Sequence, residues 1–189
     1  MKYSDAAERL AAFRKQITAI RSEMRKVQAA IEPQEVRNYV FKTEQGEAQL
    51  SDLFERNRDL FVIHNMGRQC PYCTLWADGY NGIYDHLASR AAFVVCSPDP
   101  PNVQRDFAAG RGWKFRMVSH AGTSFAEDMG YRSSRGWLPG VSVFRKDGQR
   151  ILRVSDSGCA PGDDFNALWH LLDLLPEGAG EWRPKFSYA

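Results

Sequence analysis

The sequence lacks three features that would mark a specialised class of protein. No apolar run approaches the roughly 18 residues that a membrane-spanning helix needs, and residues 1–16 lack the uninterrupted apolar core of a secretory signal. A strong excess of one charge is also absent, because 25 Lys and Arg residues face 23 Asp and Glu residues, a net charge of +2. We therefore expect a cytoplasmic protein without a membrane or nucleic-acid partner.

Cysteine is scarce as well. The chain of 189 residues has four cysteines, Cys70, Cys73, Cys96 and Cys159, and only the first two are close in sequence. A reducing compartment disfavours structural disulfides, so an isolated CxxC pair is more often redox-active or metal-binding there. We therefore expect any thiol chemistry of this protein at residues 70–73, whose sequence is Cys-Pro-Tyr-Cys.

What is present is the composition of an ordinary globular protein, with 43% hydrophobic and 25% charged residues. The length suits one domain with a proper core rather than two. The sequence has no internal repeat, low-complexity tract or interdomain linker. We divide the chain into a helical N-terminal segment, residues 1–33, and a globular domain, residues 34–189.

A long helix is predicted over residues 4–31, capped by Ser4 or Asp5 and stopped by Pro33. Its apolar residues recur at alternating steps of three and four positions, which is a 3.5-residue period. They are Leu10, Phe13, Ile17, Ile20, Met24, Val27 and Ile31. This pattern fits a helix packed along its own domain or the seam of a coiled coil, and the second alternative predicts a homodimer formed through this helix.

The remaining chain alternates between strand and helix patterns. Buried strands are predicted at 59–64 and 91–96, with a helix over 73–87 between them. The other predicted elements are strands 36–41 and 49–50 around a turn, a helical turn 52–56, a helix 103–109, a strand 114–118, a helical turn 124–129, hairpin strands 140–145 and 150–155, and a helix 165–175 capped by Asp163 or Asp164. A strand–helix–strand unit followed by a hairpin implies an α/β fold whose mixed sheet is flanked by helices. This is the thioredoxin order, with an extra N-terminal hairpin and the long helix in front.

Cys70 stands where a buried strand gives way to a helix. The free N–H groups and positive dipole end of a helix N-terminus favour an anion, so the pKa of Cys70 should fall below that of a free thiol. Arg68 would add positive charge if its side chain turned inward, and Pro71 suits the first helical turn. Cys73, one turn on, can resolve a mixed disulfide formed by Cys70. Pro71 and Tyr72 should tune the reduction potential of the pair.

Two other interpretations of the CxxC pair remain. A structural zinc site requires four ligands, and the sequence has no second CxxC pair and no HxxxH pair that could supply the other two. The two cysteines could also be incidental core residues. We expect no metal and no cofactor.

Leu138 and Pro139 form a second candidate feature. Pro139 immediately precedes the predicted strand 140–145, where a proline is tolerated because it cannot donate to the sheet. A cis bond between the two residues would aim the backbone of Leu138 at the CxxC pair, ready for an extended substrate peptide. The alternative is an ordinary trans turn proline.

The run from His64 to Asp78 resembles the domain-of-unknown-function family 899. The similarity covers nearly the whole chain, including the strand that ends at Phe41, Gly112-Trp113 and Trp182-Arg183. Members are described as predicted dithiol–disulfide oxidoreductases related to the peroxiredoxin-type thioredoxin folds. The resemblance implies a thioredoxin-like fold and a redox role, and it names no substrate.

Two departures from related families narrow the expected activity. The Cys-Pro-Tyr-Cys motif is similar to that of glutaredoxins, but Leu138 stands where they usually have valine and no clear glutathione-binding set is present. Peroxiredoxins are expected to have Thr three residues before the reactive cysteine, where this chain has Gly67. We expect a thiol–disulfide oxidoreductase acting on protein or small-molecule thiols and disulfides. The alternatives are a non-catalytic thioredoxin-like binding protein and a peroxidase.

Overall fold

The computed structural model describes residues 1–188. By its internal contacts the chain forms two compact units, one from Met1 to Pro33 and one from Gln34 onward. Within the described residues, no helix combines the length and apolarity needed to cross a bilayer.

The first unit is dominated by one helix, α1 (Tyr3–Ala29). It begins after Lys2, and no side chain caps it, so the predicted cap at Ser4 or Asp5 is wrong. Both residues lie inside the first turn, where the carboxylate of Asp5 still suits the positive end of the helix dipole. No residue of α1 is buried, and the seven apolar residues of the 3.5-residue pattern expose 45% to 70% of their surfaces.

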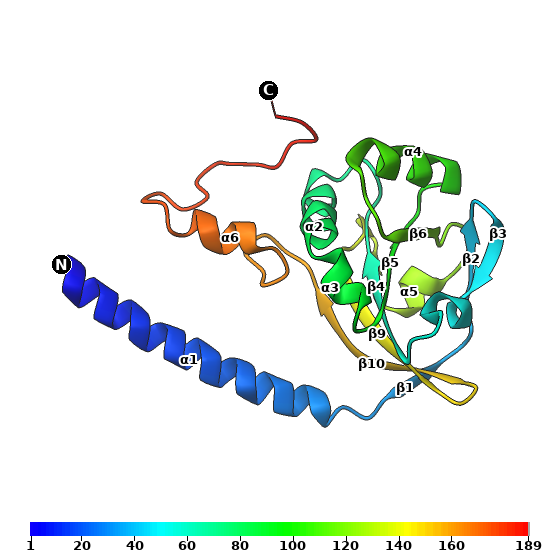
Figure 1. Ribbon diagram of the computed structural model, residues 1–189, viewed down its shortest axis with the longest axis horizontal. Coiled ribbons are helices and arrows are strands. Elements are labelled where there is room, and N and C mark those ends of the chain that lie inside the picture. Colours follow the sequence, from blue (N-terminus) through cyan, green and yellow to red (C-terminus); the bar gives the residue numbers. More distant parts are fainter. Residues whose placement is uncertain (189) are drawn as a thin grey trace. The chain divides into compact units, whose positions relative to one another are not determined.

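The second unit is built around an eight-stranded mixed sheet (Figure 1). Its strands are β1 (Gln34–Val36), β2 (Val40–Thr43), β3 (Gly46–Gln49), β4 (Asp59–His64), β5 (Ala92–Ser97), β6 (Arg116–Ser119), β9 (Gly140–Asp147) and β10 (Arg150–Gly158). They lie side by side in the order β1-β10-β9-β4-β5-β6-β2-β3. The pairs β4–β5 and β5–β6 are parallel, whereas β9 runs antiparallel to both β4 and β10. This confirms the predicted mixed α/β sheet. The extra N-terminal hairpin is also present, but its strands are β2 and β3 rather than 36–41 and 49–50.

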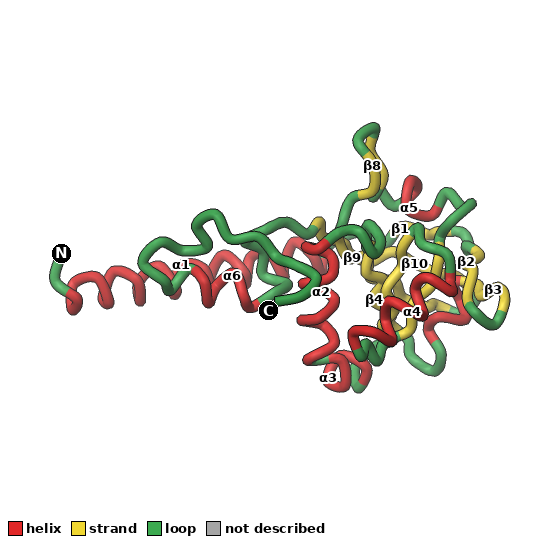
Figure 2. The backbone as a smooth tube through the Cα atoms, turned by 90° about the horizontal axis from the view of Figure 1, so that it is seen from above, coloured by secondary structure: helices red, strands yellow, loops and turns green. Residues whose placement is uncertain are grey.

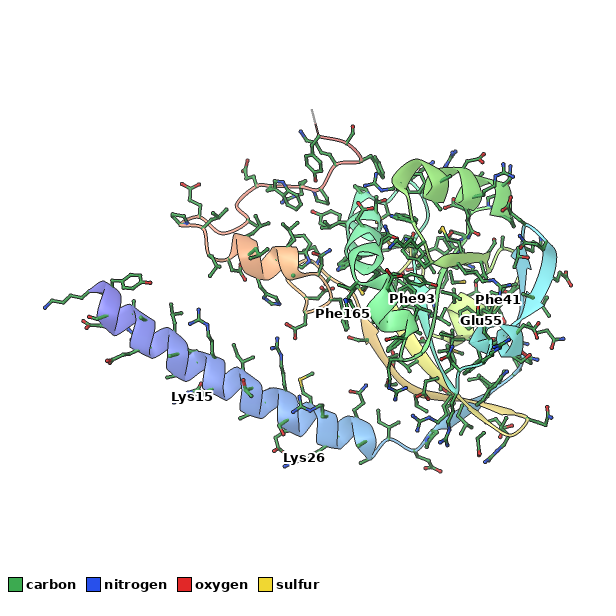
Figure 3. The ribbon with its side chains drawn as sticks, viewed as in Figure 1. Lys15, Lys26, Phe41, Glu55, Phe93 and Phe165 are labelled. Carbon is green, nitrogen blue, oxygen red and sulfur yellow. The ribbon has the colours of Figure 1, made fainter. Side chains whose placement is uncertain are left out.

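Alternate residues of the central strands face two separate cores. Leu60 and Val62 of β4 point to a core covered by the 3₁₀ helix η1 (Leu50–Phe54) and by α5 (Phe125–Asp128). Ile63 points to the opposite core, which is covered by α2 (Pro71–Gly82) and α3 (Tyr84–Ala88). Phe41 belongs to the first core and Phe93 to the second, and both rings turn into the interior (Figure 3). The sheet is therefore covered by helices on both faces.

The predicted strand 36–41 is wrong, because its two ends belong to opposite edges of the sheet. β1 pairs with β10, whereas β2 pairs with β3 and β6. In a flat sheet β1 and β2 would lie about 29 Å apart, because six spacings of roughly 4.8 Å separate them. The few residues between Val36 and Val40 span at most about 15 Å. The sheet must therefore curl, which brings its edges toward each other.

Several other element boundaries also differ from the prediction. The helix after the CxxC pair is interrupted at Ile83, so α2 and α3 replace one continuous helix. α4 (Pro101–Arg111) is longer than predicted, and α6 (Ala167–Leu172) is shorter and is capped by Asn166 rather than by Asp163 or Asp164. A small hairpin of β7 (Arg132–Ser133) and β8 (Gly136–Trp137) was not predicted, and Figure 2 shows it projecting from the body of the sheet.

Candidate active site

The loop between β4 and α2 sets the position of Cys70. The side-chain oxygen of Asn65 accepts a hydrogen bond from the N–H of Gly67 at 2.8 Å, and Asp99, beyond β5, accepts one from the N–H of Arg68 at 2.7 Å. Gly67 has a φ of 105°, and a Cβ there would lie 3.0 Å from the Asp99 carboxylate. Side chains that follow two neighbouring strands therefore hold the loop in a conformation that requires glycine at position 67.

Cys70 is the N-cap residue of α2. Its sulfur accepts the N–H of Cys73 at 3.1 Å. The pKa of Cys70 falls from 9.0 to about 7, chiefly because the Cys73 thiol donates to the Cys70 sulfur, with further help from the N–H groups of Cys73 and Tyr72. Partial burial of Cys70 opposes this fall. With such a pKa, roughly half of Cys70 is thiolate at pH 7.

Cys73 is the complementary partner. It is 3% exposed, and its sulfur accepts the N–H of Met66 at 3.5 Å. Donation to Cys70 and burial both hold the pKa of Cys73 far above its ordinary value. Both cysteines are free thiols in the structure. The arrangement thus pairs a half-buried sulfur that favours the thiolate form with a buried sulfur that favours the protonated form.

The residues between and before the cysteines differ in how they contact the site. Pro71 occupies the first turn of α2, as predicted from its missing N–H. The ring of Tyr72 stacks on Trp169 with centroids 6.3 Å apart. Arg68 is exposed and is fixed only through its backbone N–H to Asp99, so its guanidinium does not contribute to the lowered pKa of Cys70.

Leu138 and Pro139 lie at the same end of the central strands as the cysteine loop, where β4 ends and β9 begins. The strand register aligns His64 with Gly140 and Gly140 with Gly158, so the residue before β9 sits beside the loop that follows β4. The predicted cis bond is wrong, because no peptide bond among residues 1–188 is cis. Hydrogen bonds hold the segment on both sides: the N–H of Leu138 donates to the Tyr131 carbonyl at 2.9 Å, and the Pro139 carbonyl accepts the N–H of Cys159 at 3.0 Å.

A groove of about 380 Å³ opens beside this segment. Its lining includes Leu138, Pro139, Tyr131 and Cys159. Cys159 also packs against the core cluster that holds Trp76 and Tyr80 of α2, so the groove lies close to the helix that carries the cysteines. Tyr131, which the sequence did not single out, crosses Gly140 so closely that a Cβ there would lie 2.1 Å from its ring.

His64 and His120 are buried at the same end of the sheet. His64 shares a hydrogen bond of 2.9 Å between Nε2 and the Ser142 hydroxyl and stacks on Tyr131 at 3.7 Å. Burial lowers the pKa of both histidines. In the described part of the chain, neither Nδ1 atom has a hydrogen-bond partner. His64 is thus a neutral core residue.

Residues that the sequence analysis missed hold the site together. Asn65, Asp99, Tyr131 and Trp169 contact the loop, the Pro139 segment or Tyr72. None carries a local signal, because each acts through a partner distant in sequence or through loop geometry. Over residues 1–188, no group of three or more His, Cys, Asp and Glu side chains could hold a metal ion.

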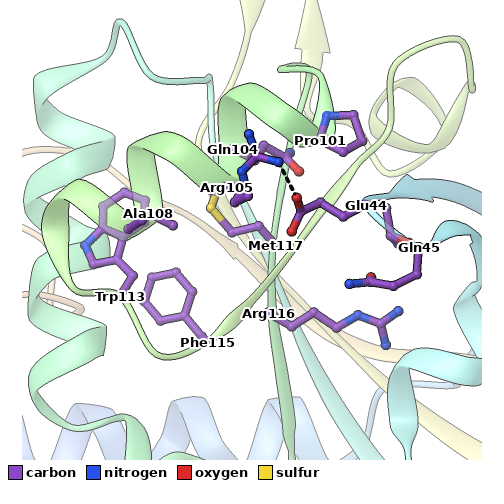
Figure 4. A pocket seen from close by; sticks show the side chains of 12 residues that line it. Glu44, Gln45, Pro101, Gln104, Arg105, Ala108, Trp113, Phe115, Arg116 and Met117 are labelled. Carbon is purple, nitrogen blue, oxygen red and sulfur yellow. Dashed lines mark hydrogen bonds and ion pairs between the residues drawn. The ribbon is translucent and has the colours of Figure 1, made fainter.

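Another hollow, of about 340 Å³, lies between α4, β6 and the turn of the β2–β3 hairpin (Figure 4). Trp113 and Phe115 form one side, Arg116 extends along another, and an ion pair of 2.8 Å joins Arg105 to Glu44 across the rim. It contains no cysteine. This hollow is therefore separate from the cysteine pair.

Comparison with solved structures places the fold. Reduced Prx3 from Vibrio vulnificus matches with a TM-score of 0.58 and 13% identity, covering 70% of this chain and 89% of that one. Peroxidoxin BcpB from Mycobacterium tuberculosis matches with a TM-score of 0.55 and 22% identity, covering 71% and 88%. A peroxiredoxin Q from Xanthomonas campestris matches with a TM-score of 0.54 and 15% identity, covering 64% and 79%. The thioredoxin-like fold of the peroxiredoxin type is thus confirmed.

The family is settled by sequence rather than by these distant structures. No curated protein matches the chain. A family model described as "Bacterial protein of unknown function (DUF899)" matches residues 1–188. The predicted resemblance is confirmed, and the protein belongs to the DUF899 family of bacterial proteins.

Proposed function

We propose that this protein is a thiol–disulfide oxidoreductase in which Cys70 is the nucleophile and Cys73 the resolving thiol. The observation that carries the proposal is the Cys70 sulfur at the start of α2, which accepts the N–H of Cys73 at 3.1 Å and has a pKa lowered to about 7. A thiolate with a pKa near the ambient pH combines availability with nucleophilicity. Peroxiredoxin-type neighbours support a redox enzyme fold.

The proposed reaction has two exchange steps. The Cys70 thiolate attacks one sulfur of a substrate disulfide, forming a mixed disulfide and releasing one substrate thiolate. Cys73 then loses its proton and attacks the Cys70 sulfur, which releases the second substrate thiolate and leaves a Cys70–Cys73 disulfide. An external dithiol returns the pair to the reduced state. Run in reverse, the same steps oxidise a substrate dithiol.

The substrate would approach along the groove beside Leu138 and Pro139, which lies close to the helix that carries the cysteines. Leu138 is 41% exposed there and offers an apolar contact. We propose a protein or small-molecule thiol or disulfide as partner, without a cofactor. A reducing compartment such as the cytoplasm would keep both cysteines in the free state from which the reaction starts.

Peroxide reduction is a second candidate, because the similar solved structures include a peroxiredoxin Q and the peroxidoxin BcpB. In that reaction Cys70 would attack a peroxide oxygen to give a sulfenic acid and water, and Cys73 would then form the disulfide with loss of a second water. Gly67 weighs against it, because peroxiredoxins are expected to have Thr at this position, and here the φ of 105° and the nearby Asp99 carboxylate disfavour any side chain. Disulfide exchange is therefore the favoured function.

The decisive experiment compares two cysteine variants in reduction of insulin or of a fluorescent mixed disulfide. We expect Cys70→Ser to abolish activity and Cys73→Ser to accumulate a mixed disulfide visible by mass spectrometry. Full activity in Cys70→Ser would refute the assignment. Rapid peroxide consumption with slow disulfide exchange would instead favour the peroxidase, and an ordinary Cys70 pKa without either activity would favour a binding protein.

A further inference from the structure

The segment that precedes and includes α6 is bound tightly to α2, the helix that carries the cysteines. The indole N–H of Trp76 donates to Asp163 at 3.2 Å, and the side-chain amide of Asn166 donates to the Leu75 carbonyl at 3.0 Å. Gly79 allows this approach, because a Cβ there would lie 2.8 Å from the Asn166 amide nitrogen. Residues 163–169 are therefore held against the cysteine helix at several points.

This docking brings Trp169 onto the residue between the two cysteines. Trp169 is 5% exposed, and its ring stacks on Tyr72 with an interplanar angle of 20°. Trp169 also meets Trp182 edge-on, with ring centroids 6.1 Å apart. Asn166 caps α6 by accepting the N–H of Leu168 at 2.9 Å, which fixes the start of the short helix from which Trp169 projects.

Tyr72 in turn is joined to the reactive sulfur through its own backbone. Its N–H is one of the groups that stabilise the Cys70 thiolate. A stacked ring restricts the side-chain torsions of Tyr72 and so the orientation of the first turn of α2. The contact chain runs from Trp169 to the ring of Tyr72, to the backbone of Tyr72, and to the sulfur of Cys70.

We propose that Trp169 is a positioning residue for Cys70 that acts through Tyr72, held in place by the docked segment 163–169. Its consequence for catalysis rests on the proposed oxidoreductase function, whereas the contacts themselves do not. Removing the aromatic ring at position 169 should loosen the first turn of α2, weaken N–H donation to the sulfur, and reduce the thiolate fraction.

The test measures the Cys70 pKa in the reduced full-length protein, from thiolate absorbance and from the pH dependence of alkylation. Trp169→Leu keeps an apolar side chain and removes the ring, whereas Trp169→Phe keeps a ring. We expect Trp169→Leu to raise the pKa by about half a unit or more, which lowers the thiolate fraction at pH 7 by about twofold. Trp169→Phe should stay close to the wild type.

A double-mutant comparison separates positioning from general loss of structure. If Trp169 acts through Tyr72, the variant with both Tyr72→Ala and Trp169→Leu should shift the pKa no further than Tyr72→Ala alone. Leu171→Ala, on the exposed side of the same helix, is the control and should leave the pKa unchanged. Additive shifts, or an unchanged pKa in Trp169→Leu, would overturn the proposal. None of these measurements uses substrate turnover. If the protein were not an oxidoreductase, the variants would still show the expected shifts of the Cys70 pKa, but the wild type would not carry out disulfide exchange.

Discussion

The two cysteines differ in reactivity because the proton between their sulfurs is shared unequally. Cys73 is buried, so charging it is costly, whereas Cys70 lies at a helix start and receives N–H donors. The hydrogen bond from the Cys73 thiol is the largest single cause of the lowered pKa of Cys70. In the proposed mechanism, the resolving residue would therefore also prepare the nucleophile before any substrate arrives.

A pair of substitutions at Cys73 tests this dependence. Cys73→Ala removes the donor and should raise the Cys70 pKa from about 7 toward its ordinary value. Cys73→Ser keeps a hydroxyl donor and should raise it less. The pH dependence of iodoacetamide alkylation reports the pKa in both variants. Equal values in the alanine and serine variants would show that donation by residue 73 is unimportant.

The buried histidines make a prediction about stability and pH. Burial lowers the pKa of His64 below 6.5. Below pH 6.5, His64 is therefore protonated in the unfolded chain while it stays neutral in the folded chain. The stabilisation is therefore complete above about pH 6.5 and is lost as the pH falls toward the folded-state pKa, by up to about 1.4 kcal/mol per pH unit for one histidine. His120 acts in the same direction.

Urea denaturation between pH 7.5 and pH 5 measures this loss. His64→Phe should be less stable at pH 7.5, because the Ser142 hydroxyl loses its partner, and its stability should fall less steeply on acidification. His86→Gln, at an exposed position, serves as the control and should retain the wild-type slope. A His64→Phe protein with the wild-type slope would contradict the expected role of His64.

At the scale of elements, the loop from Asn65 to Cys70 is the part on which the site depends most. Gly67→Ala should destabilise the fold by about 1 to 3 kcal/mol, because alanine tolerates a φ of 105° poorly and its Cβ meets Asp99. The displaced Asp99 would no longer hold the N–H of Arg68, so we expect the pKa of Cys70 to rise.

Gly46→Ala is the matched comparison for Gly67→Ala. Gly46 has a φ of 116°, and a Cβ there meets nothing within 4 Å. It should therefore show the backbone cost without a change at Cys70. Thermal unfolding and Cys70 alkylation distinguish the two effects, and a similar pKa change in both variants would argue against a specific role for the loop.

Elements with strong local patterns were predictable from the sequence. The apolar run 59–64 matches β4 at both ends, because a buried central strand needs that composition regardless of its neighbours. The pattern over 36–41 failed, because alternation does not reveal that β1 and β2 pair with strands at opposite edges. The predicted start of α6 was wrong, because Asn166 competes with the nearby aspartates to cap the helix. Its hydrogen bond to the Leu75 carbonyl favours Asn166 as the cap.

The candidate site divides in the same way. The position of Cys70 at a helix start follows from the local pattern, since a strand, a CxxC pair and a proline at the first turn occur in sequence. The residues that hold this site in place could not be predicted from the sequence, because Asp99 and Trp169 contact it only in the folded structure. The placement of the Leu138–Pro139 segment likewise involves hydrogen bonds to Tyr131 and Cys159, which are distant from it in sequence.

For the whole molecule, the main question is what the N-terminal unit contributes. The proposed chemistry lies entirely in the second unit, within the loop, α2 and the strand ends beside them. Taken by itself, α1 presents an apolar stripe with a 3.5-residue repeat, and none of its residues is buried. A repeat of this kind is typical of a helix that packs against another helix. We propose a second copy of this chain as the partner.

This proposal predicts a dimer that depends on the stripe and not on the cysteines. In sedimentation equilibrium under reducing conditions, we expect the full-length protein to be dimeric and a variant with both Ile17→Glu and Ile20→Glu to be monomeric, because buried unpaired carboxylates are costly. Lys15 and Lys26 fall outside the positions of the stripe in the 3.5-residue repeat, so Lys15→Glu and Lys26→Glu should leave the dimer intact. Cys70 alkylation should be unchanged throughout. A monomeric wild type, or a dimer that survives the two glutamates, would show that α1 does not mediate self-association.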